Sequence, residues 1–251
     1  MHNYKIFENQ DKASSYAASL VVKAAKNAID KTGVFTMVLT GGSSPLKLHN
    51  LLTEERYKNE IDWNKTLVFW GDERLVEYKS DLSNTRMAYE TLLDHLPIPS
   101  ENVHPMISKT QDIDSTSIQE VANEYEEIIK KLTNASSVPS LDLVFLGMGA
   151  DGHTASWFPD TEVVHEKQKL VSTSYNKEQK TERITLTPPL VLAAKKIVPL
   201  VFGKGKATTL KEVTKGTYNP DKLPAQLLRN AKNEVMWILD EASASLLEST
   251  D

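Results

Sequence analysis

The chain has 251 residues, enough for one large domain or two small ones with a sizeable core. Hydrophobic residues make up 40% and charged residues 25%, values typical of a globular protein rather than a disordered one. The net charge of −5 argues against a dedicated nucleic-acid surface, and the absence of cysteine excludes disulfides, thiolate metal sites and cysteine nucleophiles.

No apolar run approaches the roughly 20 residues that a membrane helix needs. Residues 1–12 are polar and charged, unlike a secretory signal. We therefore expect a cytoplasmic protein that binds neither membranes nor nucleic acids. The sequence does not specify its oligomeric state.

Short apolar runs alternate along the chain with longer segments of helical periodicity. The predicted strands are Phe35–Leu39, Thr66–Trp70, Leu141–Met148, Lys169–Ser172, Arg183–Leu186, Ile197–Phe202 and Val235–Leu239. The predicted helices are Asp11–Thr32, Pro45–Leu52, Ser83–Leu93, Ser115–Leu132, Pro188–Ala194, Lys206–Val213 and Asp240–Leu247. Continuously apolar strands indicate a sheet covered on both faces. The sequence thus predicts one α/β domain over residues 1–251, with an open, doubly wound, mainly parallel, Rossmann-like sheet and helices on both faces.

Polar, glycine-bearing loops follow four of the predicted strands directly. They are Thr40–Ser44, Gly71–Arg74, Gly149–His153 and Gly203–Lys206. In an open parallel sheet such loops gather at the carboxyl edge, where ligands bind. We therefore expect the four loops to share one site.

The first loop offers glycines and serines just before a helix that starts near Pro45. Glycines let the backbone approach a ligand, and a helix N-terminus attracts an anion. Gly42 and Ser43 are therefore candidate phosphate contacts. A plain strand-to-helix turn with a serine cap is an equally good interpretation of this motif alone.

The second loop contains Arg74, whose planar guanidinium suits a phosphate or carboxylate. Asp72 and Glu73 are candidates to orient it, act as bases or hold a metal. The alternative is a surface salt bridge, the usual fate of such residues. Arg183, at a strand start, and Lys206, at a helix start, are further candidate anchors, although most such side chains are merely solvated.

The third loop matches G-x-G-x-x-G, so a dinucleotide site has to be considered. Pro159 leaves little room for the long helix that should follow. The next strand-like run, Lys169–Ser172, is followed by no acid for a ribose before Glu178. What remains is His153, two residues after Asp151. An imidazole suits the activation of water near neutral pH, and a nearby carboxylate would fix its tautomer.

Other chemistries lack their sequence signals. No H-E-x-x-H motif or helical histidine pair indicates a metal, so we predict no metal and no cofactor. No G-x-S-x-G elbow is present, which favours direct attack by water. The remaining histidines are interpreted as surface or capping residues: His2, His49, His95, His104 and His165.

Taken together, these segments resemble the 6-phosphogluconolactonase family. The resemblance rests on Thr40–Pro45, Gly71–Arg74, Ser83-Asn84, Met87-Ala88, Asn102–His104, Gly147–Ser156, Arg183–Thr187, Lys206-Ala207 and Leu223–Ala225. It implies that water opens the δ-lactone of 6-phosphogluconate in the oxidative pentose phosphate pathway, without a redox cofactor or an obligatory metal. It also implies His153 as general base with Asp151 behind it.

By the same resemblance, the phosphate and the carboxyl end of the substrate are held by Gly42, Ser43, Arg74, Arg183 and Lys206. The chain departs from the family at residues 77–80, Glu-Tyr-Lys-Ser, where a loop containing Pro and His is common. This departure concerns the contacts of that loop rather than the chemistry.

Two other functions remain open. Glucosamine-6-phosphate deaminases share an Asp-Gly-His element, but they typically carry Asp-Glu-Tyr in place of Asp72-Glu73-Arg74 and Asn-Glu-Pro near Ser156–Pro159. A sugar-phosphate-binding module without catalysis would normally carry a helix-turn-helix segment, for which the chain before the first predicted strand is too short. Both comparisons favour the lactonase.

Overall fold

The computed structural model describes residues 3–247, in which two sheets form the framework. The larger sheet has six strands in the order β1-β9-β8-β5-β2-β3, and every neighbouring pair is parallel. Its strands are β1 (Asn3–Phe7), β2 (Phe35–Leu39), β3 (Thr66–Trp70), β5 (Leu143–Leu146), β8 (Lys196–Val201) and β9 (Glu234–Asp240). The predicted class, an open parallel α/β sheet, is confirmed.

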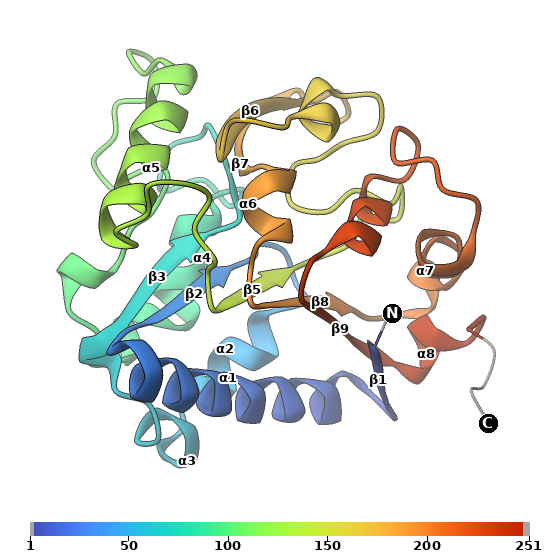
Figure 1. Ribbon diagram of the computed structural model, residues 1–251, viewed down its shortest axis with the longest axis horizontal. Helices are drawn as coiled ribbons and strands as arrows, with labels where there is room; N and C mark the ends of the chain where they lie inside the picture. Colours follow the sequence, from blue (N-terminus) through green and yellow to red (C-terminus); the bar gives the residue numbers. More distant parts are fainter. Residues whose placement is uncertain (1–2, 248–251) are drawn as a thin grey trace.

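The sheet is covered on both faces, as its buried strands require. Every residue of β2, β3 and β5 is buried. In Figure 1 the long helix α1 (Gln10–Thr32) runs along one face, where it contacts β1, β2 and β9. The opposite face lies beneath α6 (Pro188–Leu192) and a β-hairpin. The remaining helices are α2 (Leu46–Thr53), α3 (Glu55–Lys58), α4 (Asn84–Thr91), α5 (Ile118–Leu132), α7 (Ala207–Lys215) and α8 (Glu241–Ala244).

Local signals explain where the helices begin and end. The Asn9 side chain accepts hydrogen bonds from the backbone N–H groups of Asp11 and Lys12 and so starts α1. Gly33 ends this helix with a φ of 82°, a conformation that favours glycine. The Ser83 hydroxyl caps α4 by accepting from Arg86 N at 3.0 Å.

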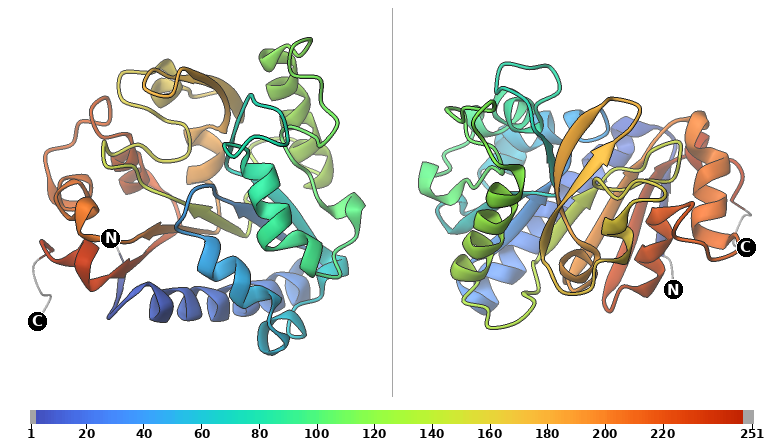
Figure 2. Two further views of the ribbon diagram at one scale, coloured as in Figure 1. Left: turned by 180° about the vertical axis from the view of Figure 1, so that it is seen from behind. Right: turned by 90° about the horizontal axis from the view of Figure 1, so that it is seen from above.

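Two predicted strands do not join the parallel sheet. The run Lys169–Ser172 overlaps only the start of β6 (Val171–Asn176), and Arg183–Leu186 falls in β7 (Thr181–Leu186). The two strands form an antiparallel hairpin, with β4 (Asp72–Arg74) added at its edge. Seen from above in Figure 2, the hairpin lies over the main sheet. A four-residue connection suffices for an antiparallel pair, whereas a parallel pair needs a long crossover.

The ends of the chain differ most from the prediction. Strand β1 was missed because it is a partly exposed edge strand without a continuous apolar run. The helix predicted over Asp240–Leu247 is only the single turn α8, which begins after Asp240 caps the N–H of Ser243 at 2.8 Å. In residues 3–247, no helix is long and apolar enough to cross a membrane.

Candidate active site

The loops that follow β2, β3, β5 and β8 meet around one cavity of about 270 Å³. Residues from all four loops line it, as expected from the topology of a parallel sheet. They include Gly42, Ser43, Arg74, His153 and Lys206. Five of the seven candidate residues therefore border the same space. Asp151 contacts His153, and Arg183 is the cross-strand partner of Arg74.

The His153 imidazole forms a close pair with the Asp151 carboxylate. Its Nδ1 lies 2.6 Å from Asp151 Oδ1, and the His153 backbone N–H donates to the same oxygen at 3.2 Å. The two side chains are 32% and 43% exposed, so water and substrate can reach them. Because the carboxylate accepts the Nδ1 proton, Nε2 is left as the basic nitrogen.

The ionisation of Asp151 follows from opposing effects. Burial disfavours its charged form, but the hydrogen bonds and charge of His153 outweigh that effect and hold the pKa of Asp151 below its ordinary value. The group therefore remains an anion beside the imidazole near neutral pH. An anion at this position stabilises the imidazolium that forms when Nε2 takes a proton.

Glycines make this pairing sterically possible. A Cβ added at Gly149 would lie 2.2 Å from both Asp151 Oδ1 and His153 Nδ1. Gly152 has a φ of 81°, and a Cβ there would lie 2.5 Å from Leu223 Cδ2. The loop is further held by Thr209 of α7, whose hydroxyl donates to the Ala150 carbonyl at 2.6 Å.

This geometry also explains why the G-x-G-x-x-G match is not a dinucleotide motif. Between β5 and β6 the chain forms only a short 3-10 turn at Glu162–His165 and no α-helix. A pyrophosphate would therefore lack the helix N-terminus that holds it in dinucleotide-binding folds. Gly149 instead gives room to the histidine and its carboxylate, and Gly152 gives room to Leu223.

The glycine-serine loop forms another wall of the cavity that His153 lines. Gly42 adopts a φ of 80°, and a Cβ at Gly41 would lie 2.0 Å from Asn84 Oδ1. Helix α2 starts at Leu46 without a side-chain cap. This wall therefore presents backbone and hydroxyl groups of the kind that bind phosphate.

Arg74 and Arg183 are cross-strand partners in the register of β4 and β7. Arg74 donates through Nη1 to the Leu82 carbonyl. Its Nε is buried and has no hydrogen-bond partner among residues 3–247. Arg74 also lines the cavity, where a guanidinium is suited to an anionic ligand.

Arg183 is 2% exposed and does not line the cavity. Its Nε donates to Thr181 Oγ1 at 3.1 Å, and Nη2 donates to Gln179. Burial and the neighbouring charge of Arg74 lower the pKa of Arg183 to about 10. It therefore stays a cation at neutral pH and adds positive potential beside Arg74.

Asp72 and Glu73, the two carboxylates of the Gly71–Arg74 segment, both have hydrogen-bond partners within the protein. Glu73 is fully buried, which raises its pKa, and it accepts from the backbone N–H groups of Arg74, Asn84 and Thr85 at 2.6–2.9 Å. Asp72 accepts from the Ser156 hydroxyl at 2.6 Å. Glu73 thus contacts Arg74 through its backbone N–H, whereas Asp72 contacts Ser156 and Asn84. No group of three potential metal-ligating side chains occurs within the described range.

The sequence analysis gave no site role to Asn84 or Phe158, although Ser83-Asn84 was part of the resemblance. Asn84 lines the cavity, and its Nδ2 donates to the Asp72 carbonyl at 2.9 Å. The Phe158 ring lies 4.9 Å from the His153 ring and lines a second cavity of about 510 Å³. His153 and Lys206 line both cavities. The position of Asn84 at a helix start, after a capping serine, could have indicated a site residue. No feature of the sequence around Phe158 indicated such a role.

Comparisons with known proteins agree with this arrangement. Residues 8–237 match the family model described as glucosamine-6-phosphate isomerases/6-phosphogluconolactonase. A probable 6-phosphogluconolactonase 3, chloroplastic, from Oryza sativa subsp. indica is 35% identical over 97% of this chain and 76% of its own length. A 6-phosphogluconolactonase from Nostoc sp. is 32% identical over 97% of both chains.

Solved structures show the same similarity. The crystal structure of 6-phosphogluconolactonase from Leishmania guyanensis superposes with a TM-score of 0.86 at 27% identity, covering 99% of this chain and 100% of that one. A monomeric glucosamine-6-phosphate deaminase reaches a TM-score of 0.80, covering 97% of this chain and 99% of its own. At 17% identity, this second likeness extends to the fold alone.

Proposed function

This chain belongs to the glucosamine-6-phosphate isomerase/6-phosphogluconolactonase family, and we propose that its four-loop cavity is where water opens 6-phospho-D-glucono-1,5-lactone to 6-phospho-D-gluconate. The reaction belongs to the oxidative pentose phosphate pathway. The observation that carries the proposal is the His153–Asp151 pair, whose imidazole lines one cavity with Arg74 and the glycine-serine loop. A base and an anion-binding wall are the two parts that hydrolysis of a phosphorylated lactone needs.

In the first step, Nε2 of His153 takes a proton from water, and the resulting hydroxide attacks the lactone carbonyl carbon. The carbonyl oxygen becomes an oxyanion in the tetrahedral intermediate. When this intermediate collapses, the bond from the carbonyl carbon to the ring oxygen breaks, and the imidazolium returns its proton to that oxygen. Asp151 accepts the hydrogen bond from the Nδ1–H of His153 throughout and stabilises the imidazolium.

The substrate phosphate is held at another wall of this cavity. Arg74 brings its guanidinium to the cavity, and Gly42 and Ser43 present backbone and hydroxyl groups to the same space. Lys206 lies beside both cavities and is suited to either end of the substrate. Arg183 acts through its charge beside Arg74. Binding energy gained at the phosphate orients the lactone carbonyl for attack.

Residues 1–251 are proposed to act as one domain, because the buried apolar residues form a single cluster that extends from Ala13 to Ala244. The cytoplasmic location stays a prediction, since the rice relative is named as a chloroplastic protein.

The test is the hydrolysis of freshly generated lactone, with the product coupled to 6-phosphogluconate dehydrogenase and the spontaneous rate subtracted. The wild type should accelerate opening, and His153→Ala should lose most of that acceleration while retaining its affinity for the product. His165→Ala, an exposed histidine away from the cavity, is the matched control. Ammonia release from glucosamine-6-phosphate without lactone opening would instead assign the deaminase reaction to this protein. A His153→Ala variant that still accelerates lactone opening would show that His153 is not the general base.

A further inference from the structure

The loop of residues 75–82 follows the proposed phosphate anchor, Arg74, and borders a third cavity at the surface. It begins just after Arg74 and ends at the carbonyl that Arg74 contacts, that of Leu82. This third cavity has a volume of about 290 Å³. Among its lining residues are Tyr78 and Lys79 from the loop and Lys109 from the segment before α5.

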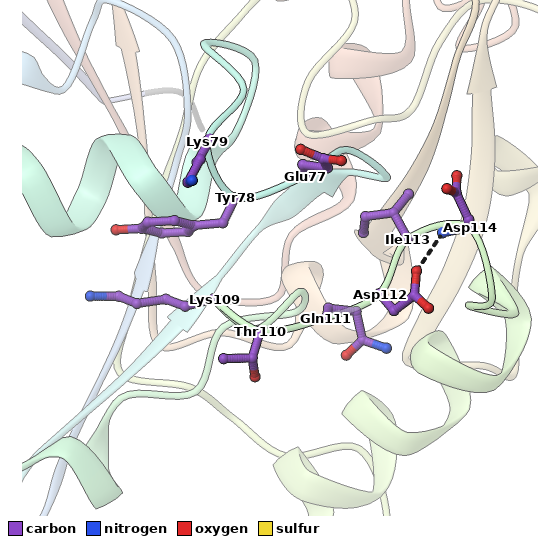
Figure 3. Close-up of a pocket in the computed structure, with 9 residues that line it drawn as sticks. All are labelled: Glu77, Tyr78, Lys79, Lys109, Thr110, Gln111, Asp112, Ile113 and Asp114. Atoms are coloured by element: carbon purple, nitrogen blue, oxygen red, sulfur yellow. Dashed lines mark hydrogen bonds between the residues drawn. The ribbon is translucent and has the colours of Figure 1, made fainter.

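Lys109 is held between two aromatic rings. Its ammonium lies 3.4 Å from the centre of the Tyr89 ring and 5.4 Å from the centre of the Tyr78 ring. The two tyrosines meet edge to face with their centres 6.4 Å apart. Figure 3 shows the Lys109 side chain running alongside the Tyr78 ring. Because Tyr89 belongs to α4, this cation–π contact fixes Tyr78, and with it the loop, onto that helix.

A second attachment fixes the end of the same loop. Arg86 of α4 donates through Nη1 to the Lys79 carbonyl at 2.7 Å and to the Asp81 carboxylate at 2.8 Å. Only Leu82 separates Asp81 from the Ser83 cap of α4. The loop is thus attached to one rigid helix at Tyr78 and again at residues 79–81, and this holds the Leu82 carbonyl in position for Arg74.

We propose that Lys109 is a positioning residue for substrate binding, which acts through Tyr78 and the Leu82 carbonyl on the guanidinium of Arg74. The inference rests on the proposed function, because it takes Arg74 as the phosphate anchor. Without the Lys109 contact, Tyr78 loses one of the two groups that hold it on α4. Part of the binding energy of the phosphate is then used to order the loop and Arg74.

The effect should be confined to binding. The His153–Asp151 pair stands on a different loop, which is held by Gly149 and Thr209. Lys109→Met keeps the aliphatic stem and removes the cation, so KM should rise about 2- to 5-fold with kcat unchanged. This change corresponds to about 0.5–1 kcal/mol, the range of an exposed cation–π contact. The inhibition constant of the product should rise by the same factor.

Two further variants separate positioning from loss of charge. Lys79→Met removes the same charge from an exposed residue of the same loop that no ring holds, and should leave KM near the wild-type value. Lys109→Arg keeps a cation that can stack on tyrosine, so its KM should stay near the wild-type value. The proposal is overturned if Lys109→Met leaves KM unchanged, if it lowers kcat instead, or if Lys79→Met raises KM equally. Failure of the proposed function is a different result, in which the wild type itself does not accelerate lactone opening.

Discussion

Acid should destabilise this fold through one buried imidazole, that of His49. The side chain is 1% exposed on α2, and its Nδ1 lies 2.8 Å from the hydroxyl of Thr91. Burial among apolar neighbours such as Leu48 and Phe145 lowers the pKa of His49 from its ordinary 6.5 to about 4. The folded protein therefore keeps this imidazole neutral at pH values where the unfolded chain protonates it.

The sign and size of the effect follow from linkage. A group with a lowered pKa in the folded state binds fewer protons folded than unfolded, so stability falls as the pH drops through 6.5 and continues to fall to about 4. Between pH 7 and pH 5, the difference in proton binding amounts to about 2 kcal/mol of unfolding free energy. Most carboxylates remain ionised across this window.

The assay is urea unfolding at pH 7 and pH 5, followed by far-UV circular dichroism. His49→Gln keeps a polar group near Thr91 but cannot titrate, so its loss of unfolding free energy between the two pH values should be about 2 kcal/mol smaller than that of the wild type. Leu52→Ala is the control, because it destabilises the same helix through a cavity and should keep the wild-type pH dependence. Equal losses for wild type and His49→Gln would refute the reasoning.

Two further substitutions test the cavity itself. Arg74→Ala should mainly raise KM for the lactone, by about 10-fold or more, because a charged hydrogen bond contributes about 1.5–3 kcal/mol. An unchanged KM in steady-state kinetics would remove Arg74 from the phosphate site. Gly149→Ala places a methyl group 2.2 Å from Asp151 Oδ1 and His153 Nδ1. The value of kcat should therefore fall at least about 10-fold, while the midpoint of thermal unfolding changes little. Full activity in this variant would show that the His153–Asp151 pair tolerates displacement.

The sequence by itself determined the layered α/β class and the gathering of loops at one edge. β2 and β3 were located to the residue, because their runs are apolar throughout and a strand buried on both faces needs no other signal. The short separation of Asp151 and His153 in a glycine-rich loop also made their contact predictable. These features depend on neighbours in the chain, which a single sequence displays directly.

Only the tertiary structure decided which distant segments meet. The pairing of β4 with β7 sets Arg74 opposite Arg183, and nothing near either residue in the sequence specifies that register. In the same way, Glu73 appeared to be a possible base, but the fold surrounds it with backbone donors from the start of α4. The physical reason is that apolar periodicity specifies which face of a strand or helix is buried, whereas its partner depends on how all the elements pack together.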